Sequence, residues 1–280
     1  MAQRLFSSSH LSHSSTSNHR NISLTSRNGL LLLVALLLLL GVSLPWTASP
    51  LFIFPNKSSS YSYSSLPSNW RDYSLAQAAK FVAKDGTVIV CTVSSPFVPF
   101  LNNWLISVSR QKHQDKVLVI AEDYATLYKV NKKWPGHAVL IPPALDSQTA
   151  HKFGSKGFFK FTSLRPRHLL QLLELGYNVM YNDVDMVWLQ DPFQYVEGSH
   201  DAYFADDRTT VDLYLLSQAA FPTGGLYFQN ATWVEETKGK HVIIHNNYII
   251  GYENKMKRFH DFGLWLVDDH AFESPLGEIE

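Results

Sequence analysis

The sequence predicts an α/β protein built on a doubly wound, mainly parallel β-sheet. Three observations support this fold class. Runs of β-branched residues alternate along residues 72–280 with segments that carry apolar residues at helical spacing. Several of these runs are continuously apolar, which is typical of strands buried on both faces. The connections between them contain Gly and Pro, which end one element before the next begins.

The first three elements of this domain are predicted to be a helix, a strand and a second helix. Residues 74–84 carry apolar residues at helical spacing, and Gly86 ends this helix. Residues 87–93, TVIVCTV, form a continuous β-branched run, so we expect a strand buried on both faces. Residues 97–110 return to helical spacing directly after Pro96, which predicts a helix that begins there.

A second strand, a short helix and a third strand follow. Residues 116–121, KVLVIA, predict another buried strand, which ends at Glu122 and Asp123. Residues 125–133 predict a short helix, because a Trp-Pro-Gly sequence stops the helical pattern directly afterwards. Residues 138–141 predict a third strand that two prolines close.

The last predicted elements of the sheet lead to the most informative part of the sequence. Residues 159–175 predict one long helix that stops at Gly176. Residues 177–182 predict a fourth strand that runs directly into Asp183. In a doubly wound sheet, ligands bind at the carboxyl ends of the strands, so this junction is a candidate binding site.

Charge and cysteine content exclude several classes of function. The chain has 24 acidic and 24 basic side chains, and residues 1–71 contain five of the basic ones and none of the acidic ones. Residues 72–280 therefore carry a formal charge of −5, whereas a nucleic-acid-binding domain needs a basic face. We expect no nucleic-acid partner. Cys91 is the single cysteine of the sequence, so no disulfide within the chain and no Cys-based metal site can form.

An apolar segment near the N-terminus predicts a membrane anchor. Residues 29–46, GLLLLVALLLLLGVSLPW, are uncharged and approach the ~20 residues that cross a bilayer. Arg4, Arg20 and Arg27 precede this segment, which predicts a cytosolic N-terminus and a folded domain beyond the membrane. A cleaved signal peptide and an organelle transit peptide are alternatives, but the length of the leucine run favours a retained signal-anchor.

The predicted organisation of the chain follows from this anchor. The predicted parts are a cytosolic tail over residues 1–28, a transmembrane signal-anchor over 29–46, a flexible Ser-rich stem over 47–71 and the folded domain over 72–280. Asn56 and Asn230 begin N-glycosylation sequons, which a lumenal location would expose to modification.

Asp183 and Asp185 are the strongest candidates for a functional site. They follow a predicted strand, and residues two apart in an extended segment point the same way. Apolar residues on both sides would half-bury the two carboxylates, which repel each other unless a cation lies between them. Oxygen ligands suit Mg²⁺ or Mn²⁺. We therefore predict a divalent metal site in preference to a solvated acidic pair.

The sequence around this pair resembles a known family. Residues 176–193, GYNVMYNDVDMVWLQDPF, resemble the D-x-D strand of plant nucleotide-diphospho-sugar transferases, and in particular the rhamnogalacturonan-II xylosyltransferase family. Further segments that match this family are FFKFTSLRPRHLLQLLELGYNV (158–179), FPTGGLYF (221–228), TKGKHVIIHNNYIIGY (237–252) and FGLWLVDDH (262–270). The resemblance covers about residues 86–280. It implies a Golgi enzyme of GT-A fold that transfers xylose from UDP-xylose to fucose with retention.

The resemblance also implies roles for residues beyond the acidic pair. In related GT-A enzymes a His, Gly and Lys arrangement completes the site, and His245, Gly251 and Lys255 match it with a longer His-to-Gly spacing. His245 would then join Asp183 and Asp185 in holding Mn²⁺ or Mg²⁺, and Lys255 would contact the diphosphate. The alternatives for this lysine are Lys238, Lys240 and Lys257.

Three more residues are candidates for binding the nucleotide. Thr92 and Asp123, at the ends of the first two predicted strands, are placed to meet the uridine. Arg165 enters the helix before the motif and would either neutralise phosphate or remain a surface charge. The implied partners are a UDP-sugar donor, a pectic polysaccharide acceptor and the Golgi membrane.

The chain departs from the family between Asp207 and Thr210. Members of the family carry several tens of residues here, including a strand of the sheet and an Asn-Asp-Gln motif near the sugar, and neither is found in this sequence. Such a gap is consistent with an exon-skipped form or a faulty gene model. We expect the donor half of the site to be retained and part of the sheet and of the acceptor site to be missing.

Four functions are therefore compared. The leading hypothesis is a UDP-xylose-dependent transferase of the Golgi lumen that acts on a cell-wall pectin side chain. A transferase that uses a different UDP-sugar is the alternative of the same class. An inactive binding or scaffold member is a different class, and the missing segment makes it a realistic alternative. A metal-dependent hydrolase would share the acidic pair but would need no nucleotide at the first two strand ends.

Overall fold

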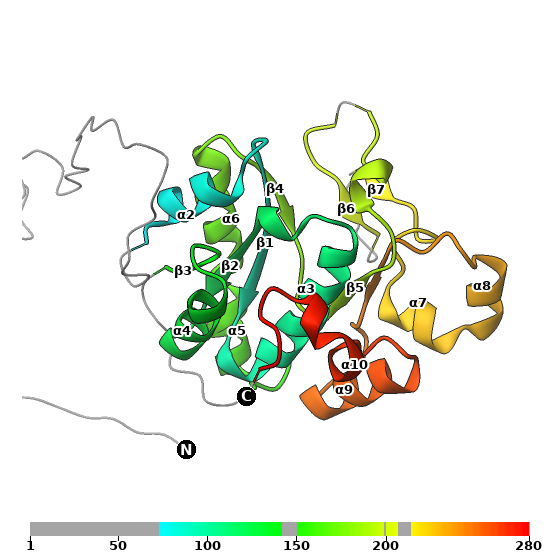
Figure 1. The fold of residues 1–280 in the computed structure, drawn as a ribbon. Helices are drawn as coiled ribbons and strands as arrows, with labels where there is room; N and C mark the ends of the chain where they lie inside the picture. Colours follow the sequence, from blue (N-terminus) through cyan, green and yellow to red (C-terminus); the bar gives the residue numbers. More distant parts are fainter. Residues whose placement is uncertain (1–72, 142–149, 199, 207–213, 280) are drawn as a thin grey trace, which may run out of the picture. The chain divides into compact units, whose positions relative to one another are not determined.

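A four-stranded parallel β-sheet with strand order β3-β2-β1-β4 forms the centre of the computed structural model (Figure 1). The structure describes residues 73–141, 150–198, 200–206 and 214–279, which all belong to one unit spanning Tyr63–Glu280. The strands are β1 (Thr87–Val93), β2 (Val117–Ala121), β3 (Ala138–Leu140) and β4 (Asn178–Tyr181). All three strand pairings are parallel, which confirms the predicted α/β fold with a parallel sheet.

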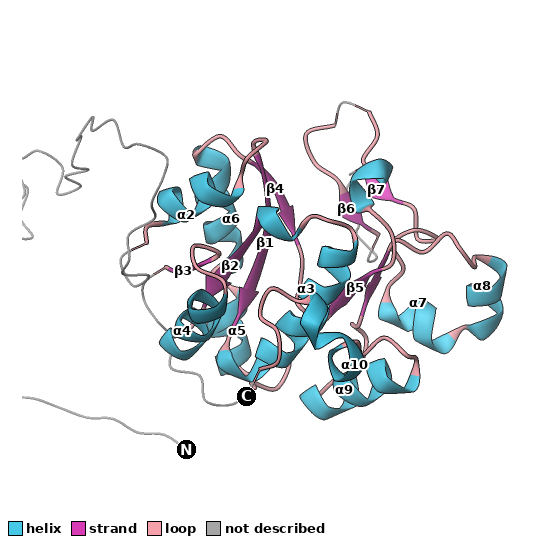
Figure 2. Ribbon diagram, in the orientation of Figure 1, coloured by secondary structure: helices cyan, strands magenta, loops and turns pink. Residues whose placement is uncertain are grey.

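Side chains of the central strands alternate between two apolar layers. Ile89 and Cys91 of β1 belong to one buried cluster, and Val88 and Val90 belong to another. Since successive residues of a strand point to opposite faces, a continuously apolar strand needs a layer of helices on each side. The layers contain α2 (Leu75–Val82) and α6 (Arg165–Glu174) on one face, and α3 (Val98–Arg110) and α4 (Tyr124–Lys133) on the other (Figure 2).

Two helices replace the single helix predicted over residues 159–175. The structure has α5 (Lys156–Thr162), a short link, and then α6. Pro166 lies in the first turn of α6, where its missing N–H costs nothing. In one continuous helix Pro166 would lack the hydrogen bond to the carbonyl of Thr162, and its ring would clash there. The prediction of one helix was wrong for this reason, and the break makes Arg165 the first residue of α6.

The chain after β4 forms two small sheets and a group of short helices. Strands β5 (Met186–Trp188) and β8 (Ile243–His245) pair antiparallel, whereas β6 (Phe204–Ala205) and β7 (Leu215–Leu216) pair parallel. The helices are α7 (Gly224–Gln229), α8 (Ala231–Glu236), α9 (Tyr252–Asp261) and α10 (Val267–His270). Single 3₁₀ turns occupy Ser95–Phe97, Gln114–Lys116, Pro192–Tyr195 and Ala271–Glu273.

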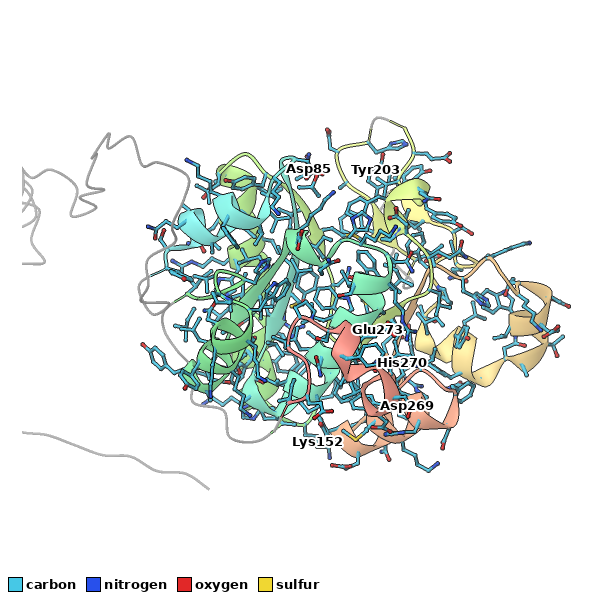
Figure 3. All side chains as sticks on the ribbon, in the orientation of Figure 1. Asp85, Lys152, Tyr203, Asp269, His270 and Glu273 are labelled. Carbon is cyan, nitrogen blue, oxygen red and sulfur yellow. The ribbon has the colours of Figure 1, made fainter. Side chains whose placement is uncertain are left out.

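The C-terminal segment is fixed to α3 by polar side chains of that helix. The buried amide of Asn103 donates to the carbonyl of Leu264 and accepts from the backbone N–H of Leu266. Arg110 forms an ion pair of 2.6 Å with Glu273, which also lies 2.9 Å from His270 (Figure 3). These contacts hold the segment that follows α9 against the centre of the domain.

Several predicted features lie outside the described residues. They are the tail, anchor and stem over residues 1–71, the sequon at Asn56, and the gap between Asp207 and Thr210. Among the described residues, no helix combines the length and the apolar composition that a membrane crossing requires.

Candidate metal centre

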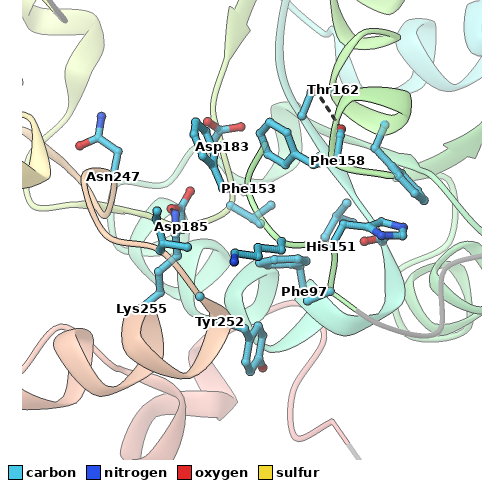
Figure 4. Close-up of a pocket in the computed structure, with 18 of the residues that line it drawn as sticks. Phe97, His151, Phe153, Phe158, Thr162, Asp183, Asp185, Asn247, Tyr252 and Lys255 are labelled. Atoms are coloured by element: carbon cyan, nitrogen blue, oxygen red, sulfur yellow. Dashed lines mark hydrogen bonds and ion pairs between the residues drawn. The ribbon is translucent and has the colours of Figure 1, made fainter. Parts of the chain in front are cut away.

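A cavity of about 880 Å³ opens at the carboxyl ends of β1 and β2 (Figure 4). Thr92 of β1 and Glu122, which follows β2, form part of its wall. The connection from β4 to β5 adds Asp183 and Asp185, and the segment after β8 closes the opposite part. The cavity therefore lies where a doubly wound sheet binds its ligands.

Asp183 and Asp185 face this cavity from the connection between β4 and β5. The intervening Val184 is 7% exposed, and Asn182 before the pair is 3% exposed. Val184 lines the cavity together with both carboxylates, and Asp185 is as little exposed as Val184. Residues 184 and 185 form a turn and not the extended segment that the sequence predicted, yet both carboxylates face the same cavity.

His245 reaches the acidic pair because β8 pairs with β5. The register of this antiparallel pair places His245 opposite Met186, the residue that follows Asp185. The backbone N–H of Asn246 also donates to the carbonyl oxygen of Asp185 at 2.9 Å. Nε2 of His245 consequently lies 3.6 Å from a carboxylate oxygen of Asp183 and 3.6 Å from one of Asp185. Ligand atoms of the three residues all lie within 4.8 Å of one another.

Gly251 and Lys255 also line the cavity, as the resemblance implied. Gly251 is the N-cap of α9 and has φ +100°, a conformation that side-chain-bearing residues rarely adopt. This backbone turn starts α9 beside the cavity, so that Lys255, in the second turn, points its ammonium at Asp185. Nζ of Lys255 donates to Oδ2 of Asp185. Of the alternatives, Lys238, in the turn after α8, pairs with Glu235, and Lys257 pairs with Asp261 on the exposed side of α9.

Asp183 has its own set of partners. Arg165 forms an ion pair of 2.8 Å with Oδ1 of Asp183, and the hydroxyl of Tyr181 donates to the same oxygen at 2.8 Å. The other carboxylate oxygen of Asp183, Oδ2, takes part in neither interaction and faces His245. Arg165 lines the cavity and is therefore part of the site.

Cationic side chains of the chain itself offset the negative charge of the two carboxylates. Burial alone would raise the pKa of Asp185, but the positive charges of Lys255 and His245 outweigh this effect and hold that pKa well below its usual range. For His245, burial favours the neutral form, yet the carboxylates of Asp185 and Asp183 raise its pKa above the ordinary value. Asp185 is therefore ionised at neutral pH and available as a ligand.

A buried hydrogen-bond network supports the acidic pair from behind. Oδ1 of Asn182 accepts a hydrogen bond from the indole N–H of Trp188 and another from that of Trp104. The amide nitrogen of Asn182 donates to the carbonyl oxygen of Tyr181. Trp104 belongs to α3 and Trp188 to β5, so this network joins three elements at the residue before Asp183. No sequence pattern predicts this role, because the two tryptophans approach Asn182 from different elements.

The two strand-end candidates for the nucleotide differ in their surroundings. Thr92 lines the cavity and is 3% exposed. Asp123 is the N-cap of α4, and its two carboxylate oxygens accept backbone N–H groups of Thr126 and Ser95, each at 2.7 Å. Glu122, the preceding residue, takes the place in the cavity wall that the sequence suggested for Asp123. An acidic residue directly before a helical pattern is a capping signal, which identifies Asp123 as structural.

Aromatic side chains form much of the remaining wall. Phe97, Phe158, Tyr248 and Tyr252 line the cavity, and Figure 4 shows Phe158 and His151 across the cavity from Lys255. Asn247, beside His245 in the sequence, accepts the backbone N–H of Gly224 at 2.6 Å and so attaches α7 to the segment that carries His245.

Asn230, the second sequon residue, is exposed, and its side-chain oxygen accepts the backbone N–H of Trp233 at 3.0 Å. It caps α8 and lies on a helix junction outside the cavity.

Comparison with known proteins shows similarity along the whole chain. A family model of nucleotide-diphospho-sugar transferases matches residues 112–212. UDP-D-xylose:L-fucose alpha-1,3-D-xylosyltransferase 1 of Arabidopsis thaliana is 62% identical over 355 positions, which cover 100% of this chain and 98% of that protein. UDP-D-xylose:L-fucose alpha-1,3-D-xylosyltransferase MGP4 of the same species is also 62% identical. That match covers 98% of this chain and 95% of the relative.

A more distant relative is UDP-galactose:fucoside alpha-3-galactosyltransferase of Dictyostelium discoideum. It is 26% identical, and the match covers 45% of this chain and 31% of that protein. No solved structure matches the chain.

Proposed function

This chain belongs to the family of UDP-D-xylose:L-fucose alpha-1,3-D-xylosyltransferases, and on that basis we propose that it transfers a xylosyl group from UDP-xylose to a fucose residue. The observation that carries the proposal is the cluster of Asp183, Asp185 and His245 in the cavity at the sheet edge. A sugar nucleotide needs its diphosphate neutralised there, and this cluster provides ligands for a divalent ion.

The residues of the cluster fit Mn²⁺ or Mg²⁺. Two carboxylates and one imidazole form a donor set that suits such ions, and the ligand atoms of Asp183, Asp185 and His245 lie close enough to share one. When bound, the ion would supply positive charge that stabilises the departing UDP. Arg165 and Tyr181 orient Asp183 for this purpose by holding its other oxygen.

Two cationic side chains add to the charge that the diphosphate would meet. Lys255 and Arg165 both line the cavity beside the acidic cluster. Lys255 would bind the diphosphate of the donor, whereas Arg165 is held on Asp183 and supplies charge from the other side. The α linkage is formed from an α-linked sugar nucleotide, so the transfer retains the anomeric configuration.

The wider setting is part of the same proposal. The order of the parallel strands and the position of the acidic pair support a GT-A-like fold. Residues 29–46 would anchor the chain in the Golgi membrane as a single-pass type II protein with a lumenal domain over residues 72–280. The acceptor would be a pectic polysaccharide such as rhamnogalacturonan-II, and Asn56 and Asn230 would be glycosylated in the lumen.

A second candidate function is a donor-binding member that does not complete the transfer. The 280 residues of this chain are aligned over 355 positions with a relative, so about 75 positions have no residue from this chain. In the described residues β4 is an edge strand that pairs with β1 alone, and three of its four side chains are only partly buried. Both observations support a missing segment, which we place between Asp207 and Thr210.

One experiment separates these functions. UDP binding and UDP release from UDP-xylose are measured with the full-length chain in Mn²⁺, with and without a methyl fucoside acceptor. Acceptor-dependent release identifies the transferase, and UDP binding without release identifies the donor-binding member. Equal release without acceptor identifies a hydrolase. Absence of Mn²⁺-dependent UDP binding in folded protein would overturn both proposals.

A further inference from the structure

Glu122 is an acidic side chain in the cavity that the metal centre does not use. It directly follows β2 and lines the cavity at the same sheet edge as Thr92. Its side chain accepts no hydrogen bond and forms no ion pair with any residue in the described part of the chain. Its neighbour Asp123 is instead fully occupied by two backbone N–H groups. Glu122 therefore has both carboxylate oxygens available for a ligand.

Two other polar atoms of the cavity wall can accept or donate further hydrogen bonds. Oγ1 of Thr92 is buried, and the hydroxyl of Tyr181 beside it donates to Asp183 and not to Thr92. Nε of Arg165 is buried and has no hydrogen-bond partner among the described residues, although Nη1 of the same guanidinium binds Asp183. Buried polar atoms are normally paired, so unpaired atoms in a cavity wall indicate a ligand that completes them.

The cost of keeping Glu122 in this position supports the same conclusion. Burial raises the pKa of Glu122 to about 7, and the positive charge of Arg165 only partly offsets the effect. Glu122 is half-buried, and a carboxylate that is partly withdrawn from water without a hydrogen-bond partner is unfavourable for folding. Such a group is commonly found where it is used for binding.

We propose that Glu122 binds the ribose of the donor nucleotide, with its carboxylate accepting hydrogen bonds from the 2′ and 3′ hydroxyls and Thr92 beside it. This proposal rests on the proposed function, which supplies the nucleotide. Two adjacent hydroxyls offer two donors, which match the two acceptor oxygens of a carboxylate. The imide edge of uracil offers one donor flanked by two carbonyl oxygens, which a carboxylate would repel. In other nucleotide-binding α/β sheets an acidic residue holds the ribose in the same way.

The test compares nucleotides that differ only in one hydroxyl. Equilibrium binding of UDP and of 2′-deoxy-UDP is measured in Mn²⁺ for the full-length chain and for Glu122→Ala and Glu122→Gln. The unmodified chain is expected to bind UDP at least about tenfold more tightly than 2′-deoxy-UDP, which is the range for a hydrogen bond to a charged group. Glu122→Ala is expected to lose most of this preference by weakening UDP alone.

Glu174→Gln, a change of an exposed acid on α6, is the matched control and is expected to keep the full preference. If Glu122→Ala weakens both nucleotides equally, or if the unmodified chain shows no preference, the proposal is overturned. A loss of preference for UDP over CDP in the Glu122 variants would assign the residue to the base and also overturn it. Failure of the unmodified chain to bind UDP at all would instead refute the proposed function, and the ribose proposal with it.

Discussion

The side-chain oxygen of Asn182 lies 2.6 Å from the indole nitrogen of Trp188, which donates a hydrogen bond to it. Trp104 donates to the same oxygen at 3.3 Å, and all three side chains are buried. Because Asn182 immediately precedes Asp183, this pair of hydrogen bonds fixes the backbone from which the acidic cluster projects. The candidate metal site thus depends on a polar contact inside the apolar core.

Replacement of Asn182 by Leu is expected to lower the free energy of unfolding by about 2–4 kcal/mol, because two buried indole N–H groups would lose their acceptor. We also expect weaker Mn²⁺ binding. Urea denaturation measures the first effect and Mn²⁺ titration the second. Asn178→Ala, on the exposed part of β4, is the control and should change neither. Unchanged stability in Asn182→Leu would contradict the structural role assigned to this residue.

Replacement of Asp185 by Asn is expected to weaken Mn²⁺ binding by more than the ten- to hundredfold that is typical of losing an outer partner of a metal ligand. The reason is that the change removes a ligand charge while Lys255 and His245 remain next to the site. Free Mn²⁺ measured by electron paramagnetic resonance reports the affinity. Asp261→Asn, on the exposed face of α9, should leave it unchanged. Equal Mn²⁺ affinity in Asp185→Asn and the unmodified chain would show that the ion binds elsewhere.

Replacement of Lys255 by Met is expected to change the affinities for the ion and for the nucleotide in opposite directions. Without nucleotide, Mn²⁺ should bind at least about threefold more tightly, since a positive charge beside Asp185 has been removed. UDP should bind about tenfold more weakly in Mn²⁺, because its diphosphate loses a charged donor. Calorimetric titrations measure both, with Lys257→Met as the exposed control on the same helix. Weaker binding of Mn²⁺ alone would rule out this role of Lys255.

Replacement of Gly224 by Ala is expected to destabilise the domain by about 1–3 kcal/mol. A Cβ at this position would overlap the carbonyl oxygen of Asn247 and lie 2.7 Å from that of His245, and both are backbone atoms that cannot move aside cheaply. Gly225→Ala is the matched comparison, because the nearest atoms to its Cβ would belong to the side chain of Tyr248, the first at 3.2 Å. Thermal unfolding measures the stability of both variants, and Gly224→Ala is expected to be the less stable one. A larger loss of stability in Gly225→Ala would contradict this prediction.

Acid is expected to destabilise the domain through His137. Burial lowers the pKa of this histidine to about 4, from 6.5 in an unfolded chain. Between these values the unfolded chain binds the proton and the folded one does not, so stability falls as the pH decreases. The expected loss from pH 7 to pH 5 is about 2 kcal/mol. Urea denaturation at both pH values should show a smaller loss of unfolding free energy in His137→Gln than in the unmodified chain. An equal loss in the two proteins would assign the acid sensitivity to other groups.

The strands of the central sheet could be predicted because their signal is local. The predicted strand over residues 87–93 coincides with β1. The predicted strands for β2 and β3 are one residue too long at one end, and the one for β4 is one residue too long at each end. Continuous β-branched runs that are bounded by Gly or Pro indicate buried strands without information from the rest of the chain. Pro166 shows the limit of such patterns: the apolar spacing on both sides is helical, but one proline divides the segment into two helices.

The candidate site could be predicted only in part, for a related reason. Asp183 and Asp185 are found from spacing within one strand end, whereas His245 reaches them through the pairing of β5 with β8, which joins residues about sixty positions apart. Such a register is not encoded in the local pattern, and only the resemblance to a family suggested His245 and Lys255. Strand-end position pointed to Asp123, whereas Glu122 lines the cavity, because that position alone does not tell which of two adjacent acids caps a helix.

The contact between Asp185 and Lys255 has a practical consequence for work with the protein. A buried carboxylate usually destabilises the folded state when its counter-charge is removed. Here the counter-charge is part of the chain itself, so treatment with a chelator should leave the domain folded. The same preparation could then be stripped and reloaded in turn with Mg²⁺, Mn²⁺ or Co²⁺, which makes it suited to ranking inorganic cofactors on one batch of protein.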